Sequence, residues 1–307
     1  MSKTRVLTYG PEAIAEAVAL IRAGRPVAVP TETVYGLAAD ATNGEAVARI
    51  YEAKGRPSFN PLIVHVLDLA AAEQFGVFDE RARALASEYW PGPLTLVVPR
   101  RANCRVASLA TAGLETIAIR VPAHRAMRAL LEATGVPLAA PSANASGRIS
   151  PTRVEHVLAT LDGRIAMIIS DGACAVGIES TIVTTAGGGV CVLRSGPVLV
   201  TSSIDKTDVE ALPMAPGQAA RHYAPTKPLR IGAVAARQDE WHVGFGAVAG
   251  NASLSPTGDL VEAAACLFGV MHDADQSAQN RIAVAPVPHI GLGIAINDRL
   301  VRAAAIS

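Results

Sequence analysis

The stretch VAVPTETVYGL, residues 27–37, decides how we interpret the fold of this chain. Its apolar start, residues 27–29, predicts a short buried strand. Pro30 has no amide hydrogen to give to a sheet, so we expect the strand to end there and a polar loop to follow. Open α/β sheets tend to bind small ligands at such strand ends. For residues 30–37 alone, an ordinary turn capped by threonine and glutamate is the simpler explanation.

The composition indicates two domains or one large domain, with a substantial core. The chain has 307 residues, of which 50% are hydrophobic and only 4% aromatic. Small side chains of this kind favour close packing of helices on a sheet. Basic and acidic residues number 27 each, so the net charge is zero. This balance argues against binding of nucleic acid by bulk electrostatics, although it leaves room for a local basic cleft.

The sequence lacks the usual features of an exported or membrane protein. The cysteines at positions 104, 174, 191 and 266 do not have the spacing of a zinc site or a disulfide framework, and we interpret them as reduced residues. The first residues lack the apolar core of a signal peptide. Prolines and glycines interrupt the apolar stretch 282–296, so it does not predict a membrane span. We expect a cytoplasmic protein that does not bind membranes.

Helical and strand patterns alternate along the chain. A helix is expected over residues 14–21, with Gly24 ending it, and Thr152 with Glu155 predicts a capping box for a helix that reaches residue 161. Residues 197–228 are rich in proline and lack periodicity, so we interpret them as a linker. Beyond it, strands are expected at 229–234, 243–248 and 282–287, and helices at 260–268 and 297–305. This order predicts a small parallel α/β domain.

Two groups of polar residues could form a phosphate site. Lys54 and Arg56 flank a glycine at the end of an expected helix, in a turn that we expect to be exposed. An ammonium beside a guanidinium fork suits a polyphosphate. Cations at a helix C-terminus are also favoured simply by the helix dipole. Ser142 and Asn144 lie in a loop of small residues that could hold an anion, or could serve ordinary turn chemistry. The residues by themselves do not decide between these alternatives.

Two further polar residues lie within apolar strand patterns. His65 belongs to the expected strand 62–66, where a lone histidine is more often a core residue than a ligand. Arg120 belongs to the expected strand 117–121, where a guanidinium needs an anionic partner. A ligand carboxylate and an Asp or Glu of the chain would satisfy Arg120 equally well. Both interpretations of Arg120 therefore stay open.

Several motifs follow one another in a fixed order. They are PTETVYGL at 30–37, KGRPSFNPLIVH at 54–65, WPGPLT at 90–95, PSANASG at 141–147, EST at 179–181, LRSG at 193–196 and RHYAP at 221–225. In this order and spacing they resemble the YrdC-like family, and within it the long, two-domain threonylcarbamoyl-AMP synthases. The resemblance covers about residues 11–197 and continues into the linker. There, residues 218–220 (QAA) replace the methionine and aromatic residue common in the family.

The resemblance implies a fold and a division of the chain. The fold class is α/β, with a twisted mixed-sheet YrdC-like domain around a concave cavity and a small C-terminal Rossmann-like parallel α/β domain. The YrdC-like catalytic domain is expected at residues 8–199 and the C-terminal domain at 229–307. Between them, residues 200–228 are expected to form a linker that acts as a lid over the active site.

The resemblance also assigns site residues through matching positions. The catalytic positions of the family match Lys54, Arg56, Ser142 and Asn144. Its ATP-binding positions match Arg56, Asn60, Thr116, Ser142, Ser150, Arg194 and Tyr223. Its threonine-binding positions match Thr33, His65, Arg120, Ala140 and Ser180. No protein side chain is expected to bind a metal.

The implied reaction is a nucleotidyl transfer. L-Threonine, bicarbonate and ATP would give L-threonylcarbamoyl-AMP and pyrophosphate, with Mg²⁺ accompanying ATP and no tightly bound cofactor. A separate transferase would use the product to form N6-threonylcarbamoyladenosine in tRNA, at the adenosine next to the anticodon.

Two alternatives are an RNA-binding module and a carbamoyl-transfer domain of the same fold from hydrogenase maturation. Zero net charge and few aromatic residues disfavour the first, so direct RNA binding is expected to be weak at most. The absence of zinc-finger and acylphosphatase-like segments disfavours the second.

Overall fold

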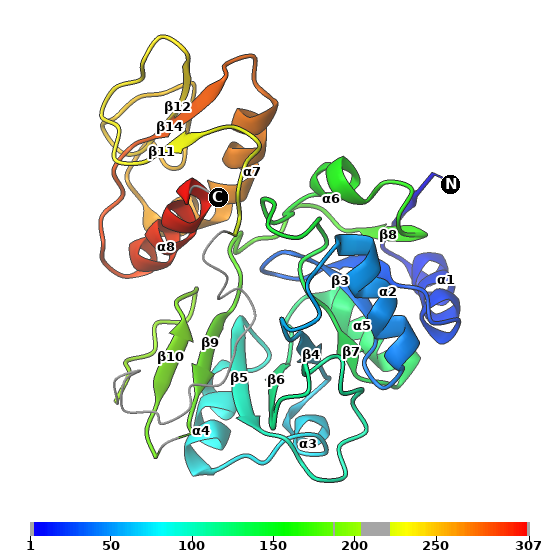
Figure 1. The fold of residues 1–307 in the computed structure, drawn as a ribbon. Coiled ribbons are helices and arrows are strands. Elements are labelled where there is room, and N and C mark those ends of the chain that lie inside the picture. Colours follow the sequence, from blue (N-terminus) through cyan, green and yellow to red (C-terminus); the bar gives the residue numbers. More distant parts are fainter. Residues whose placement is uncertain (1–2, 187, 204–221, 306–307) are drawn as a thin grey trace.

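The chain folds into two α/β units. The computed structural model describes residues 3–186, 188–203 and 222–305. Figure 1 shows a larger unit, which carries a ten-stranded sheet, and a smaller C-terminal unit, which carries a four-stranded sheet. None of the described helices combines the length and the apolar character needed to cross a bilayer.

The sheet of the larger unit is mixed. Its strands are β1 (Arg5–Thr8), β2 (Val27–Pro30), β3 (Tyr35–Asp40), β4 (Ile63–His65), β5 (Leu94–Pro99), β6 (Thr116–Arg120), β7 (Leu138–Ala139), β8 (Met167–Ser170), β9 (Thr181–Thr184) and β10 (Cys191–Arg194). Their spatial order is β1-β8-β2-β3-β7-β4-β6-β5-β9-β10. Neighbours such as β4 and β6 run parallel, whereas β3 and β7, or β5 and β6, run antiparallel. Strands that are far apart in the sequence are therefore neighbours in this sheet.

The stretch 27–37 forms a hairpin. Strand β2 ends at Pro30, as its missing amide hydrogen predicts, but the expected loop is shorter than residues 30–37 because β3 begins at Tyr35 and pairs with Pro30. The Thr31 hydroxyl closes the turn by accepting the Thr33 and Val34 amides, each at 3.2 Å. This local hydrogen bonding lets the chain return to the sheet after four residues.

Helices cover both faces of the larger sheet. They are α1 (Pro11–Arg22), α2 (Gly44–Lys54), α3 (Leu69–Ala72), α4 (Glu80–Tyr89), α5 (Arg125–Thr134) and α6 (Val154–Leu161). Strand β2 shows the two faces: Val27 and Val29 pack with α1 and α5, whereas Ala28 packs with α2 and α6. This alternation is the period of two that places successive strand side chains on opposite faces.

The predicted capping box of α6 is wrong. The helix begins at Val154, its N-cap is Arg153, and no side chain caps it. The amide of Thr152 instead donates to His156 Nδ1 at 3.2 Å. His156 in turn stacks on His272 of the C-terminal unit, with ring centres 3.9 Å apart. Packing between the two units therefore replaces the local capping pattern.

The C-terminal unit is a small parallel α/β unit, as predicted. Its strands are β11 (Leu229–Arg230), β12 (Glu240–Gly244), β13 (Ala252–Ser253) and β14 (Arg281–Val284), in the order β11-β14-β12-β13, and its helices are α7 (Leu260–Gln276) and α8 (Leu292–Ala304). All its strand pairs are parallel. Helix α8 starts five residues before the predicted 297 and includes Gly293. A Cβ there would lie 1.9 Å from the Pro288 carbonyl oxygen, so this glycine allows a close approach rather than breaking the helix.

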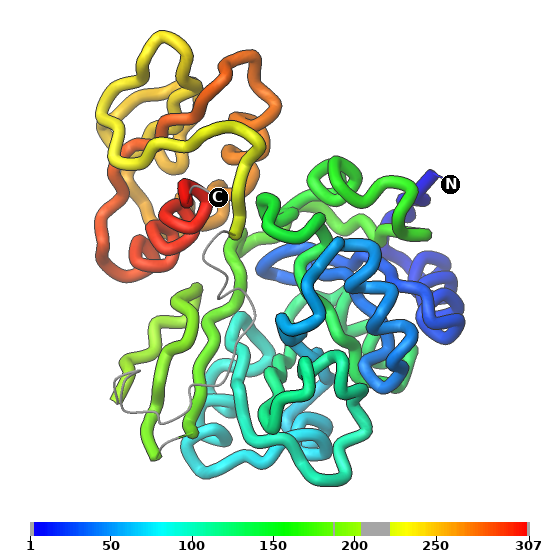
Figure 2. Tube along the Cα trace, viewed as in Figure 1, coloured from blue at the N-terminus to red at the C-terminus, as the bar shows by residue number. Residues whose placement is uncertain are grey.

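An apolar cluster joins the two units. Ile149 and Ile178 of the larger unit pack in one buried cluster with Phe268 of α7 and Ile296 of α8. Figure 2 shows the chain coming back beside the larger unit at residues 222–228 before it reaches β11. At this point the Ala224 amide donates to the Gly147 carbonyl at 2.8 Å. The C-terminal unit is thus packed directly against the larger unit.

Candidate active site

A pocket lies where the ends of several strands meet the chain that precedes the C-terminal unit. It is lined by Thr31, Thr33, Val34, Gly36, Arg56, Ile63, His65, Arg120, Ala140, Pro141, Ser142, Glu179, Ser180, Arg194, His222 and Tyr223. These residues come from the β2–β3 hairpin, from strands β3, β4, β6 and β10, from the loops after α2 and β7 and before β9, and from the segment that precedes β11. Strand-end geometry, not sequence proximity, brings them together.

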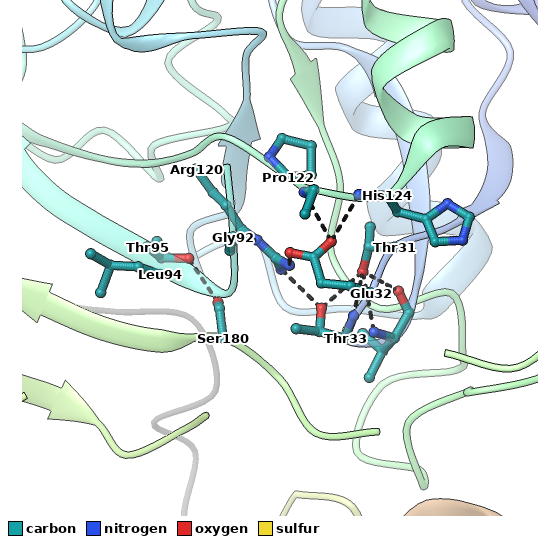
Figure 3. A network of polar contacts seen from close by, with 12 residues as sticks. Thr31, Glu32, Thr33, Gly92, Leu94, Thr95, Arg120, Pro122, His124 and Ser180 are labelled. Carbon is teal, nitrogen blue, oxygen red and sulfur yellow. Dashed lines mark hydrogen bonds and ion pairs between the residues drawn. The ribbon is translucent and has the colours of Figure 1, made fainter. Parts of the chain in front are cut away.

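The charge of Arg120 is paired within the chain. Its Nη2 lies 2.5 Å from Glu32 Oε1, and its Nη1 donates to the Thr33 hydroxyl at 2.9 Å. The second carboxylate oxygen of Glu32 accepts the Ala123 and His124 amides. Figure 3 shows Arg120, Glu32 and Thr33 pointing toward one another. Of the two partners left open by the sequence, the structure places the carboxylate of the chain itself against Arg120.

This pairing sets the ionisation of Glu32. Burial alone would raise the pKa of its carboxyl group, but the Arg120 charge and the hydrogen bonds to it lower the pKa below 4.5 overall. Arg120 is 3% exposed, so the pair is well shielded from solvent. The hairpin and β6 are therefore locked together by a charged hydrogen bond.

Ser180 connects β5 to β10. Its hydroxyl lies 2.7 Å from Thr95 Oγ1 on β5. Arg194 Nε and Nη2 donate to the Ser180 carbonyl at 3.0 and 2.8 Å, and Nη2 also reaches the Ser180 hydroxyl at 3.1 Å. Figure 3 shows Ser180 and Thr95 facing each other near Arg120. This network holds a serine hydroxyl and an arginine together in the pocket wall.

His65 is held neutral. It lies at the end of β4, is buried, and lines the pocket. Burial, together with the nearby positive charge of Arg120, lowers its pKa to about 3. Within the described residues its Nδ1 atom has no hydrogen-bond partner. A neutral imidazole with an unmatched nitrogen could bond to a ligand in the pocket.

Lys54 supports the loop after β7. The sequence placed it in an exposed turn, yet it is 3% exposed, so that expectation is wrong. Its Nζ donates to the carbonyls of Ser142 and Asn144 and to Asn144 Oδ1. The Ser142 hydroxyl donates to the same Asn144 oxygen at 2.6 Å. Burial, and then the charge of Arg56, lowers the pKa of Lys54 well below 10.5.

Arg56 brings a second buried cation to the pocket. It was also expected in an exposed turn, but it is 9% exposed and lines the pocket. Its guanidinium donates to the carbonyls of Asn60 and Pro61 at 3.3 and 3.1 Å. Burial lowers its pKa to about 10, and the neighbouring charge of Arg194 acts in the same direction. The site therefore collects cations at a cost that an anionic ligand would offset.

Tyr223 forms the wall nearest the C-terminal unit. Its ring packs on Phe268 of α7, with centres 5.7 Å apart, and beside His222 at 4.1 Å. Its φ of 63° is unusual for a bulky residue, and such backbone geometry tends to occur at functional sites. Its hydroxyl is buried, and within the described chain it has no hydrogen-bond partner. The Tyr223 hydroxyl is therefore free to donate a hydrogen bond to a ligand.

The structure brings together most of the residues that the sequence singled out. All five residues predicted to bind threonine line the pocket, as do Arg56, Ser142, Arg194 and Tyr223 of the predicted ATP set. Lys54 and Asn144 lie directly behind Ser142. Ser150 is buried and bonds to the lining residue Glu179, and Asn60 contacts Arg56 through its carbonyl. Thr116 begins β6, about 13 Å along the strand from Arg120, and is not among the lining residues.

Sequence reasoning missed Glu179 and His222 as lining residues. Glu179 follows the apolar Ile178 directly, and an acid next to a buried residue was the available signal. Burial, and then the cations Arg56 and Lys54, lowers the pKa of His222 to about 3. Within residues 3–186, 188–203 and 222–305, no cluster of three His, Cys, Asp or Glu residues could hold a metal ion.

Comparisons with known proteins agree with this architecture. Residues 19–196 match the family model described as "Telomere recombination", and residues 190–305 match the model described as "Threonylcarbamoyl-AMP synthase, C-terminal domain". A threonylcarbamoyl-AMP synthase of Bacillus subtilis is 39% identical over 98% of this chain and 95% of its own length. The chain belongs to the threonylcarbamoyl-AMP synthase family.

A second relative within the threonylcarbamoyl-AMP synthase family matches this chain over both units. The synthase of Pyrococcus abyssi is 37% identical over 94% of this chain and 92% of its own length. The crystal structure of P. abyssi Sua5 complexed with L-threonine matches with a TM-score of 0.87 and 33% identity, over 99% of this chain and 98% of that one. The predicted two-unit α/β fold is therefore confirmed.

Proposed function

We propose that this protein synthesises L-threonylcarbamoyl-AMP and pyrophosphate from L-threonine, bicarbonate and ATP, and that its product supplies tRNA modification. One observation carries the proposal: a single buried pocket has two chemically different walls. One wall offers hydroxyls beside an internally paired arginine, Arg120. Another gathers the buried cations Arg56 and Arg194. A neutral amino acid and a polyphosphate would be served by these two walls.

The threonine side of the proposed site consists of Thr33, His65, Arg120, Ala140 and Ser180. Thr33 and Ser180 offer hydroxyls, and His65 offers an unmatched nitrogen. Ala140 is small, which leaves room for an aliphatic side chain. Arg120 uses one side of its guanidinium for Glu32 and could bind a ligand carboxylate with its remaining N–H groups. These features support a zwitterion with a hydroxyl group as the ligand.

The nucleotide side of the proposed site consists of Arg56, Ser142, Arg194 and Tyr223. Lys54 and Asn144 act behind it by holding the Ser142 loop. Guanidinium groups suit phosphate oxygens, and Tyr223 lines the same pocket. Asn60, Thr116 and Ser150 complete the predicted ATP set and stay predictions. Mg²⁺ would enter with ATP, because phosphate oxygens are hard ligands for it.

The proposed chemistry requires no side-chain nucleophile. Bicarbonate takes up a proton and loses water to give CO₂. The threonine amine attacks the carbon of CO₂, so that a C–N bond forms while one C=O π bond opens onto oxygen, and the nitrogen then loses a proton to give a carbamate. A carbamate oxygen then attacks the α-phosphorus of ATP, and pyrophosphate leaves. The pocket residues contribute by aligning the two ligands and by stabilising the charge that develops on the phosphates. Burial strengthens these electrostatic contacts because water is excluded.

The predicted lid at residues 200–228 falls partly outside the described residues, since 204–221 are not described. Its end, His222 and Tyr223, forms part of the pocket wall. We propose that the linker closes over the adenylate and keeps water from the mixed anhydride. We also propose a cytoplasmic location, because Cys104, Cys174 and Cys266 are free thiols, as in reducing compartments. A separate tRNA threonylcarbamoyl transferase would consume the product.

The test is an activity assay with purified protein in which each substrate is left out in turn. Purified protein is mixed with ATP, Mg²⁺, L-threonine and bicarbonate, and pyrophosphate and the adenylate are measured by a coupled assay and mass spectrometry. Both products should form only when threonine and bicarbonate are present together. Release of ADP and phosphate, or pyrophosphate release without threonine, would contradict the proposal. Retention of RNA at physiological salt without any adenylate would favour the RNA-binding alternative instead.

A further inference from the structure

Arg299 connects the C-terminal unit to the pocket wall. It lies on α8 and is 1% exposed. Its Nη1 contacts the Ala295 carbonyl and Asp298 of its own helix, and its guanidinium also reaches the larger unit. Burying a guanidinium is costly unless its donors are paired. The partners of Arg299 therefore indicate what this burial serves.

The guanidinium of Arg299 reaches three parts of the pocket wall. Its Nε pairs with Glu179 Oε2 at 3.1 Å, and its Nη1 donates to the Ser195 carbonyl at 2.5 Å. Its central carbon lies 5.6 Å from the centre of the Tyr223 ring. Glu179 and Tyr223 line the pocket, and Ser195 directly follows the lining residue Arg194. One side chain of the C-terminal unit thus fixes three pieces of the site at once.

Glu179 explains why a cation is needed at this place. Its carboxylate is 7% exposed and lines the pocket, and its other oxygen accepts the Ser150 hydroxyl. An uncompensated carboxylate there would repel the phosphates of ATP. Paired with Arg299, the same carboxylate is neutralised and is held against Ser150. The proposed threonine-side residues make no contact with Arg299 among the hydrogen bonds and ion pairs of the described chain.

We infer that Arg299 is a positioning residue for ATP, supplied by the C-terminal unit: it neutralises Glu179 and fixes the Ser195 turn and Tyr223 around the nucleotide side. This inference rests on the proposed function. It gives the C-terminal unit a direct part in ATP binding, in addition to packing. Because Arg299 acts through other residues, its loss should affect ATP and threonine unequally.

The first test compares substrate dependence in the wild type and in Arg299→Met. Methionine fills similar apolar space but has no charge. We expect the KM for ATP to rise at least about 10-fold, because one partner of a buried charge pair is lost. The KM for threonine should stay within about twofold, since its side of the pocket keeps its contacts. A purely structural defect would instead lower the active fraction and leave both KM values unchanged.

The second test removes the charge that Arg299→Met leaves behind. In the double variant Arg299→Met/Glu179→Gln, the carboxylate no longer repels phosphate, while the amide oxygen of glutamine can still accept the Ser150 hydroxyl. We expect the KM for ATP to return most of the way to the wild-type value. A stabilising role alone predicts that the double variant regains thermal stability, while the KM for ATP is at the wild-type value in both variants.

A matched control and a milder variant complete the design. Arg230→Met breaks a pair with the buried carboxylate of Glu240 inside the C-terminal unit, at residues that do not line the pocket, although the Arg230 side chain is 33% exposed. It should lower the melting temperature without changing the KM for ATP. Arg299→Lys keeps a charge but loses the fork that serves Glu179 and Ser195 together. If Arg299→Met does not fold, a several-fold rise in the KM for ATP in Arg299→Lys alone supports the inference.

The outcomes separate this inference from the proposed function. A wild-type protein that makes no adenylate overturns both. An active wild type, with KM for ATP unchanged in Arg299→Met or in Arg299→Lys, overturns the role of Arg299 and leaves the proposed function standing. An equal rise in the KM of ATP and threonine, with no recovery in the double variant, also overturns it.

Discussion

The threonine side and the nucleotide side of the pocket differ in whether their buried cations have a counter-charge within the protein. On the threonine side, Arg120 is matched by Glu32, and His65 is kept neutral by burial. On the nucleotide side, Lys54 and Arg56 donate to neutral oxygens, and burial lowers the pKa of both. The first side is prepared for a ligand without net charge. On the nucleotide side, burial of the cations is unfavourable, and a bound anion would offset this cost.

The two sides also differ in what holds them. Threonine-side residues stand on the hairpin after β2, on β4 and β6, and beside β9, which belong to one sheet. The nucleotide side has Arg194 on β10, but it otherwise depends on loops and on contacts of Tyr223 with Phe268 and Arg299 from the C-terminal unit. A site on strands is held by the sheet itself, whereas the nucleotide side can respond to the packing of a second unit.

Breaking the charge pair of the threonine side should have the largest effect on stability. Glu32→Ala leaves the guanidinium of Arg120 buried without a counter-charge, which is expected to cost about 3–5 kcal/mol of unfolding free energy. Urea unfolding followed by circular dichroism measures it. The double variant Glu32→Gln/Arg120→Met should recover most of this stability yet bind threonine poorly. Equal stability of Glu32→Ala and wild type would contradict the pairing.

The same pair predicts that the unfolding free energy depends on pH in the acidic range. Because the pKa of Glu32 is lowered in the folded protein below 4.5, its contribution to stability is present above pH 4.5 and is lost as the pH falls through the folded-state value. The difference in unfolding free energy between wild type and Glu32→Gln should therefore shrink below pH 4.5. A difference that stays constant from pH 7 to pH 3, on the same urea series, would show that Glu32 is not ionised in the pair.

Removing a cation from the nucleotide side should abolish most activity. Arg56→Met is expected to lower kcat/KM by about 10²–10³-fold, or about 3–4 kcal/mol of transition-state stabilisation. Threonine binding, measured by calorimetry, should be retained. Because Arg56 is buried, the melting temperature of Arg56→Met must be measured as well. The control is Arg83→Met, which replaces an exposed arginine of α4 that pairs with Glu73. Pyrophosphate release at the wild-type rate would remove Arg56 from the site.

Substrate choice should reflect the hydroxyls of the threonine side. Valine would leave a polar group near Thr33 or Ser180 unpaired, a penalty of about 1–3 kcal/mol in kcat/KM. Serine lacks only a methyl group, worth about 1 kcal/mol of burial, so it should be the closer competitor. Parallel assays with the three amino acids at equal concentration decide this order. Valine turned over as well as threonine would show that these hydroxyls do not face the ligand.

For His65 we expect no effect of pH on the binding of threonine near neutrality. With its pKa lowered to about 3, His65 stays neutral, so the affinity for threonine should show no histidine inflection between pH 5 and pH 8. Equilibrium binding is the proper measurement, since turnover also depends on the ionisation of bicarbonate. An inflection near pH 6.5 that disappears in His65→Gln would mean that the pocket opens to water more than the structure indicates.

The sequence by itself determined the order of elements and the residues that meet in the pocket. Pro30 ends β2 because it lacks an amide hydrogen, and motifs far apart in the chain were enough to select Thr33, His65 and Ser180. The resemblance to one family added Arg120, and these residues stand on or next to strands of a single sheet. Strand ends of one sheet converge whatever lies between them.

Only the tertiary structure decided which charges are paired and which walls the C-terminal unit builds. Lys54 and Arg56 follow a helix and look exposed in the sequence, yet the loop after β7 buries Lys54. The expected capping box of Thr152 gave way to His156, whose ring stacks on His272 across the two units. The pair of Arg299 and Glu179 spans 120 residues. No local pattern encodes such contacts, because burial and partner choice depend on surfaces that meet only after both units have folded.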